Sequence, residues 1–104
     1  MMTVSFFRAG DFDEEVLPFL RLAVRDTLEY NEIESVSAVS DGNDIVSQLF
    51  RELAPKHPEI TFSILMPNGE NDDSFIDSSD IIICRKQHSN YLRSISKRFD
   101  LYAM

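Results

Sequence analysis

A chain of 104 residues with 43% hydrophobic residues and a net charge of −8 is long enough for one hydrophobic core and too short for two. This composition excludes a disordered chain. No apolar run approaches the roughly 20 residues that a helix needs to cross a bilayer, and no basic stretch precedes an apolar one at the start, as an export signal requires. We therefore expect a single cytoplasmic domain over residues 1–104, with no membrane contact.

The charge is unevenly distributed along the chain. Residues 1–80 hold 17 acids against five bases, a net of −12, whereas residues 81–104 hold one acid against five bases. An acidic body of this kind repels nucleic acid and attracts basic proteins over about a Debye length, roughly 8 Å at physiological salt. The single cysteine, Cys84, excludes an intrachain disulfide and fits a reducing compartment.

The first third of the chain predicts a strand followed by a helix. Thr3–Arg8 is rich in β-branched and aromatic residues, which favours a strand. Asp11 and Glu14 have the spacing of a capping box, and apolar residues then recur at steps of three and four to about Tyr30. Pro18 interrupts this pattern, so the helix either begins near Pro18 or is kinked there.

The middle of the chain predicts a strand, a helix and another strand. Residues 33–39 mix serine and glutamate with apolar residues and indicate a short strand. After a turn cluster at 40–43, an apolar stripe over residues 45–53 predicts a helix that Pro55 stops. Residues 60–66 alternate apolar and polar side chains, which predicts a strand with one buried face.

The last third begins with a long acidic loop at 67–80. Residues 81–84 are apolar on both faces, which predicts a central strand. A final helix is expected to place apolar residues on one side (His88, Leu92, Ile95, Phe99 and Tyr102) and polar ones on the other (Lys86, Asn90, Arg93 and Lys97).

These elements predict an α/β fold in the order β-α-β-α-β-β-α, with a mixed four-stranded sheet covered by three helices. This order resembles that of thioredoxin-like domains, and Pro58 lies in roughly the place of that family's cis-proline. Residues 11–14 (Asp-Phe-Asp-Glu) stand where the family carries Cys-x-x-Cys. In the thioredoxin-like arrangement the third strand is reversed. A parallel third strand would instead bring the acidic segments 11–15, 41–44 and 70–73 to one end of the sheet.

The residues that carry reactive chemistry in other proteins are sparse here. Cys84 precedes two cations and His88, a setting that lowers a thiol pKa, although an apolar strand also favours a buried core thiol. His57 and His88 have no metal-ligand spacing, and no phosphate-binding or nucleophile motif occurs. We therefore expect no catalytic residue, no metal and no cofactor. A binder of nucleic acid would be basic overall, so direct binding is not expected either.

The leading hypothesis is a non-catalytic acidic domain that docks on a basic protein partner, above all a nucleic-acid-handling one, and inhibits or regulates it. In size, acidity and lack of a reaction centre it is similar to nuclease immunity proteins and anti-defence inhibitors. Carboxylates would steer and pair with the partner's Lys and Arg, while Phe75 and Ile76 would supply apolar area. The expected partner-binding residues are Glu70, Asp72, Asp73, Phe75 and Asp77, then Asp11, Asp13, Glu14 and Glu15.

Two alternatives come from other classes of function. One is a thioredoxin-like scaffold with a thiol-dependent role at Cys84, which requires that thiol to be exposed with a base within hydrogen-bond reach. The other is a homo-oligomeric structural protein, for instance a homodimer, with the last helix or an edge strand as its interface.

Overall fold

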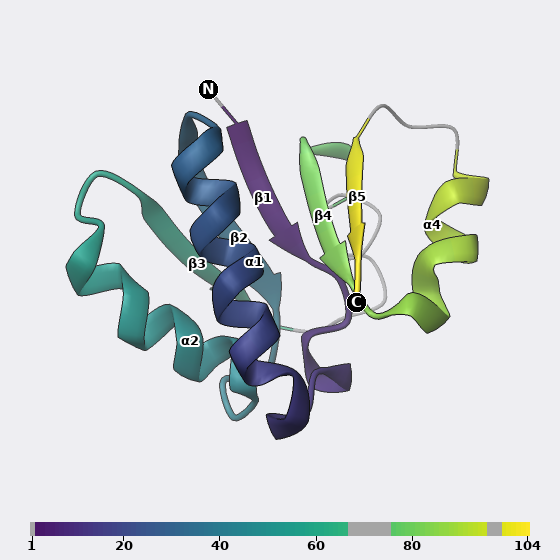
Figure 1. Ribbon diagram of the computed structural model, residues 1–104, viewed down its shortest axis with the longest axis horizontal. Coiled ribbons are helices and arrows are strands. Elements are labelled where there is room, and N and C mark those ends of the chain that lie inside the picture. Colours follow the sequence, from purple (N-terminus) through teal and green to yellow (C-terminus); the bar gives the residue numbers. More distant parts are fainter. Residues whose placement is uncertain (1, 67–75, 96–98) are drawn as a thin grey trace.

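One parallel sheet of five strands organises the chain, in the order β3-β2-β1-β4-β5 (Figure 1). The computed structural model describes residues 2–66, 76–95 and 99–104. The strands are β1 (Met2–Phe6), β2 (Ile33–Val39), β3 (Thr61–Leu65), β4 (Ile81–Cys84) and β5 (Asp100–Ala103). The helices are α1 (Leu17–Tyr30), α2 (Ile45–Leu53) and α4 (Ser89–Ser94), with short 3₁₀ segments η1 (Ala9–Asp11), η2 (Glu14–Val16), η3 (Ala54–Lys56) and η4 (Lys86–His88).

The predicted single α/β domain is confirmed, but the predicted mixed, four-stranded sheet is wrong. β3 runs parallel to β2, with five residue pairs in unbroken register. The physical reason lies in the connection: α2 and η3 carry the chain back along the sheet, so β3 starts at the same end as β2. The reversed third strand of the thioredoxin-like arrangement is therefore absent from this sheet.

The fifth strand replaces the end of the predicted last helix. α4 stops at Ser94, and Ile95 already has an extended backbone (φ −84°, ψ 118°). Residues 100–103 then pair with β4 along its full length. All four residues of β4 are buried, and a buried strand needs hydrogen-bonding neighbours on both sides. The pairing with β4 overrides the helical spacing of the apolar residues near the C-terminus.

The start of the first helix also differs from the capping-box prediction. Residues 9–16 form the two 3₁₀ segments η1 and η2, and α1 begins at Leu17. Pro18 lies in the first turn of α1, where a helix does not use the backbone donor that proline lacks. The prediction that the helix begins near Pro18 is therefore confirmed, and the capping box at Asp11 and Glu14 is wrong.

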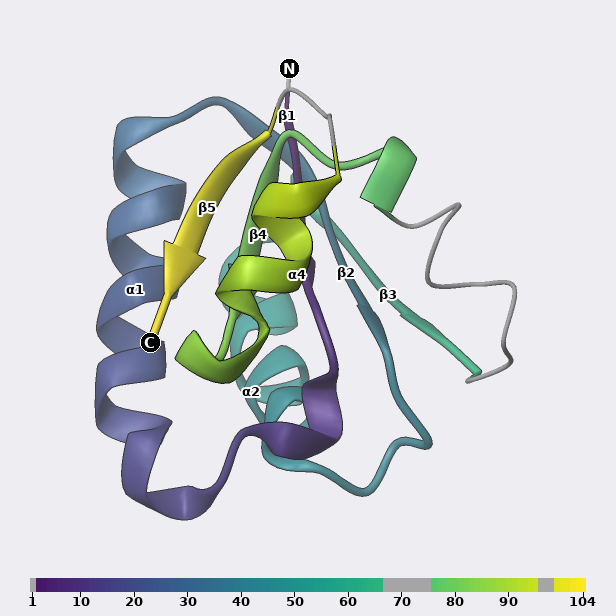
Figure 2. The same ribbon diagram turned by 90° about the vertical axis from the view of Figure 1, so that its right-hand side faces the viewer.

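Helices cover both faces of the sheet and bury two hydrophobic clusters (Figure 2). On the α1 and α2 side, the ring of Phe6 meets those of Phe12 and Phe50 edge to face, at centroid distances of 6.0 and 5.6 Å. On the α4 side, the cluster consists of Phe7, Ile76, Ile82, Cys84 and Leu92. Among the described residues, no helix is long and apolar enough to cross a membrane.

A buried polar network fixes the start of α2. The carboxylate of Asp44 accepts hydrogen bonds from the backbone N–H of Ser47 (2.9 Å), the hydroxyl of Ser47 (3.0 Å) and the hydroxyl of Ser40 (2.5 Å). Both serines are buried. Asp44 is thus the N-cap of α2 and the main acceptor for two buried hydroxyls.

Asp44→Ala is expected to lower the free energy of unfolding by about 1–2 kcal/mol, because it removes the cap and leaves buried hydroxyls short of an acceptor. Asp41→Ala is the control: its carboxylate is in the same turn but exposed, and it accepts one hydrogen bond, from the exposed backbone N–H of Asn43 (2.9 Å), so we expect a change within about 0.5 kcal/mol. Urea unfolding followed by circular dichroism measures both. Equal effects of the two substitutions would contradict the role of Asp44.

Candidate functional site

The acidic loops meet at the carboxyl edge of the sheet, the lower end of the strands in Figure 1. Because β1 and β2 are parallel neighbours, the segments that follow them, 11–15 and 41–44, emerge at the same edge. Asp11, Asp13, Glu14, Glu15 and Asp41 are all exposed. β3 ends at this edge too. Parallel strands therefore bring two of the three predicted acidic segments together, and the third, 70–73, lies outside the described residues.

The other predicted binding residues are distributed differently. Glu70, Asp72, Asp73 and Phe75 lie outside the described residues. Asp77 is exposed but precedes β4, so it lies toward the amino end of the strands, away from the carboxyl edge. Ile76 is 2% exposed and packs in the core. The expectation that Ile76 forms an apolar anchor for a partner is therefore wrong, because its side chain is buried in the hydrophobic cluster on the α4 side of the sheet.

Cations share the carboxyl edge with the acids. Arg85, Lys86 and His88 follow β4, and Arg8 follows β1. The imidazole Nε2 of His88 lies 2.5 Å from Oδ2 of Asp11, across 77 positions of sequence. The edge consequently carries the acids that follow β1 and β2, with Arg8 and Arg51 among them, and only cations after β4. Sequence reasoning missed the Asp11–His88 pair, since only the adjacency of β1 and β4 brings the two loops together.

Arg8 has an unusual backbone at the end of β1. Its φ of 56° and ψ of 62° place it in the left-handed region, and it is the one non-glycine residue with positive φ among those described. This conformation costs a non-glycine residue about 1–2 kcal/mol. Strained residues of this kind cluster at functional sites, where the surrounding structure enforces them. This backbone conformation makes the exit of β1 a candidate functional position.

Cys84 does not meet the requirements for thiol chemistry. Its side chain is 0% exposed and belongs to the cluster under α4. Burial raises the pKa of the thiol, and the nearby positive charge of Arg93 offsets this only in part. A raised pKa leaves less thiolate at neutral pH, and the thiolate is the nucleophile. The structure places Cys84 as a core residue.

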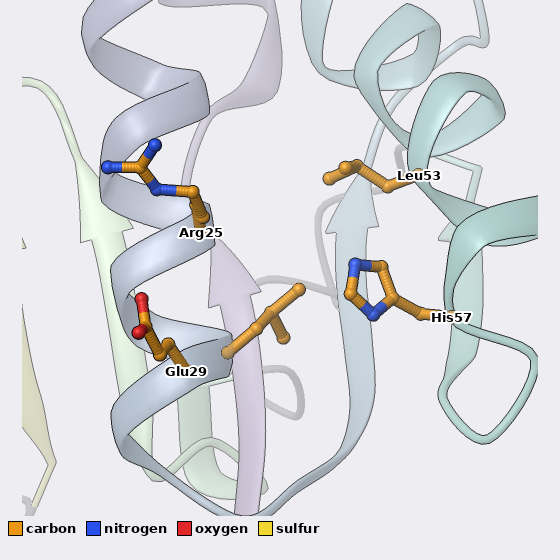
Figure 3. A pocket seen from close by; sticks show the side chains of 5 residues that line it. Arg25, Glu29, Leu53 and His57 are labelled. Carbon is orange, nitrogen blue, oxygen red and sulfur yellow. The ribbon is translucent and has the colours of Figure 1, made fainter.

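A pocket of about 300 Å³ opens between α1 and the α2–η3 segment (Figure 3). His57 has its Nδ1 3.6 Å from a carboxylate oxygen of Glu59. The lining residues that the structure describes include no hydroxyl or thiol that His57 would activate. The pocket is therefore an apolar groove with a charged rim. Its lining consists of Arg25, Leu28, Glu29, Leu53 and His57.

The same two helices are joined by a bidentate ion pair. The guanidinium of Arg21 donates to both carboxylate oxygens of Glu52 at 3.0 Å. This hydrogen bonding lowers the pKa of Glu52. Both side chains are well exposed, so the pair orients α1 and α2 on the surface and contributes little to stability.

No metal site is formed by the part of the chain that the structure describes, where no three His, Cys, Asp or Glu side chains come together. Comparison with known proteins finds no matching family model, no matching curated protein and no matching solved structure.

Proposed function

We propose that the chain is a non-catalytic domain that docks on a basic protein partner, above all a nucleic-acid-handling one, and inhibits or regulates it. The observation that supports this most directly is the parallel pairing of β1 and β2. It leaves residues 11–15 and 41–44 at one edge of the sheet, so their negative charges act together on a partner. β3 ends at the same edge.

The proposed docking surface consists of the exposed carboxylates at this edge. Asp13, Glu14 and Glu15 carry most of it, because all three are exposed and adjacent in sequence. Asp11 contributes less, since His88 contacts its carboxylate. Glu70, Asp72, Asp73 and Phe75 stay in the proposal as the segment that follows β3. Asp77 is left out because it precedes β4 at the other end.

Docking would proceed in two steps. Electrostatic attraction first guides the basic partner to the acidic surface, and ion pairs with the partner's Lys and Arg then form. A cluster of like charges accelerates encounter with an oppositely charged protein by 10-fold to 1000-fold at low salt. Individual exposed ion pairs add little affinity, so occlusion of the partner's own anion-binding surface is the mechanism of inhibition. Such binding weakens as salt increases, because exposed charges are screened.

The test compares two triple charge reversals that alter the net charge equally. The first variant, Asp13→Lys with Glu14→Lys and Glu15→Lys, removes the acidic cluster at the carboxyl edge. The control, Glu32→Lys with Glu34→Lys and Glu59→Lys, reverses three exposed acids that lie before or at the start of β2 and β3. Each variant and the wild-type chain serve as bait for affinity capture from a host lysate at low and high salt.

The expected result is a basic protein that the wild type and the control retain at low salt and lose at high salt, and that the first variant fails to retain. We expect the first variant to weaken binding about 10-fold or more, since several charged contacts are reversed together. Equal capture by all three baits, or capture that salt does not weaken, would overturn the proposal.

The homo-oligomeric alternative gains one specific observation. β3 is an edge strand of the sheet, and Ile64, Leu65 and the following Met66 are exposed. Neither a charge nor a proline interrupts β3, and these are the residues that natural proteins use to block edge pairing. Sedimentation equilibrium of the wild-type chain measures the mass in solution and so distinguishes a homo-oligomer from a monomer.

A further inference from the structure

The carboxyl ends of β1 and β4 form a topological switch point. The two strands are parallel neighbours in the middle of the sheet. The chain leaves β1 toward the face that α1 covers and leaves β4 toward the face that α4 covers (Figures 1 and 2). In open parallel sheets, ligands bind outside the strand ends where the connections diverge to opposite faces. In this chain that position lies between residues 7–16 and 85–88.

Three side chains gather there around the ring of Phe7, and a fourth contacts one of these three. The ring of His88 meets it edge to face at 5.4 Å, and the ring of Tyr91 stacks on it at 5.9 Å. The guanidinium carbon of Arg8 lies 5.3 Å from its centroid. Asp11 adds the contact with His88 that joins the two loops. We call these five residues the Phe7 cluster.

The Phe7 cluster is partly open to solvent. The Tyr91 residue is 50% exposed, and the side chains of His88 and Asp11 are 22% and 39% exposed. Phe7 itself is buried. The buried ring thus contacts one polar group that follows β1, one in η4, and the exposed aromatic ring of Tyr91 on α4.

The chemical groups of the Phe7 cluster match the two halves of a nucleotide. A guanidinium is permanently charged and binds phosphate through paired hydrogen bonds. A half-exposed aromatic ring offers a face on which a base stacks. Gln87, whose amide nitrogen lies 3.4 Å from Nε2 of His88, is exposed beside them as a further donor.

We infer that the Phe7 cluster binds a free mononucleotide, with the phosphate at Arg8 and Gln87 and the base against Tyr91. The left-handed backbone of Arg8 then has a function, because it sets the direction in which the chain leaves β1 beside the phosphate. His88 is a positioning residue that ties the β4 loop to Asp11. This inference goes beyond docking and does not depend on it, since Asp13, Glu14 and Glu15 are outside the cluster.

The acidity of the chain makes this inference easy to test. A net charge of −8 repels anions at long range, so non-specific adsorption of a phosphate compound is disfavoured. Saturable binding therefore requires specific donors. The probes are AMP, adenosine, which lacks the phosphate, and ribose 5-phosphate, which lacks the base.

The measurement is a titration of the isotope-labelled full chain, followed by amide chemical shifts. We expect saturable shifts with AMP at residues 8, 87, 88 and 91, and binding of adenosine and of ribose 5-phosphate that is weaker by about 10-fold each. If no saturable shift is seen up to about 10 mM AMP, any remaining affinity is too weak for a specific site, and the inference is overturned. Equal binding of AMP and adenosine, or shifts confined to other regions, would overturn it too.

Two variants identify the contacts. Arg8→Gly removes the guanidinium, and glycine adopts the same positive φ without strain, so the loop keeps its course. It is expected to weaken AMP binding by about 10-fold while leaving adenosine binding unchanged. Tyr91→Leu is expected to weaken AMP and adenosine but not ribose 5-phosphate.

Arg25→Gln is the charge-matched control. Arg25 is an exposed cation on α1, outside the Phe7 cluster, and its loss should leave AMP binding within about 2-fold of wild type, as expected for a distant site. Wild-type AMP affinity in Arg8→Gly, or an equal loss in Arg25→Gln, would show that the bound anion does not use Arg8 and would overturn the inference. Neither outcome affects the docking proposal, which the lysate captures decide.

Discussion

Phe6→Ala is expected to lower the free energy of unfolding by about 3–5 kcal/mol, the largest loss we predict for a single substitution in this chain. Phe6 is 0% exposed, and its ring packs edge to face on Phe12 and Phe50. Removing the ring leaves a cavity between β1 and α2, because the surrounding helices relax only in part. A domain of this size has a total stability of about 5–15 kcal/mol, so the variant approaches the limit of folding.

Phe19→Ala is the matched control for this prediction. Phe19 lies on α1 with 63% of its surface exposed, and the same substitution there should alter the free energy of unfolding by no more than about 0.5 kcal/mol. Urea unfolding curves for the three proteins give the comparison. If Phe19→Ala costs as much as Phe6→Ala, then burial between β1 and α2 is not the source of stability that the structure indicates.

Modification of Cys84 by a thiol reagent is expected to be at least about 1000-fold slower in the native protein than in the protein unfolded by urea. The thiol is fully buried, so the reagent reaches it only through an opening of the fold. The raised pKa of the buried thiol acts in the same direction, because it lowers the thiolate fraction at neutral pH.

A second cysteine at an exposed position provides the internal standard. In a Phe19→Cys variant, we expect one thiol to react at the rate of an unfolded chain and Cys84 to remain protected, as mass spectrometry of the modified peptides would show. Rapid modification of Cys84 in the native wild type would contradict its placement in the core and would revive the hypothesis of a thiol-dependent role.

Elements with a strong local signal were predicted at nearly their observed positions. The apolar stripe at 45–53 coincides with α2, and Pro55 lies just beyond its end. The four consecutive apolar residues of β4 are all buried, as a central strand requires. In both cases the side chains inside the element are enough to specify it, so the element can be predicted without knowing the rest of the chain.

Elements that depend on a distant partner were predicted wrongly or left open. Residues 100–103 form β5 because β4 offers an unpaired edge, although their apolar spacing also suits a helix. The direction of β3 depends on the path of α2 and η3, which local periodicity does not report. The Asp11–His88 pair has no signature in sequence for a similar reason, since each residue alone is an ordinary loop residue.

The candidate site also combines features that the local sequence determines with features that only tertiary contacts determine. The order of charges along the sequence alone determined that this chain is acidic with a basic C-terminal end. Only the tertiary structure decided that residues 11–15 and 41–44 share an edge of the sheet, that Ile76 and Cys84 are core residues, and that Arg8 and Tyr91 face the same buried ring. Side-chain chemistry is a property of single residues, whereas proximity between distant residues arises from the pairing and direction of strands, which long-range contacts determine.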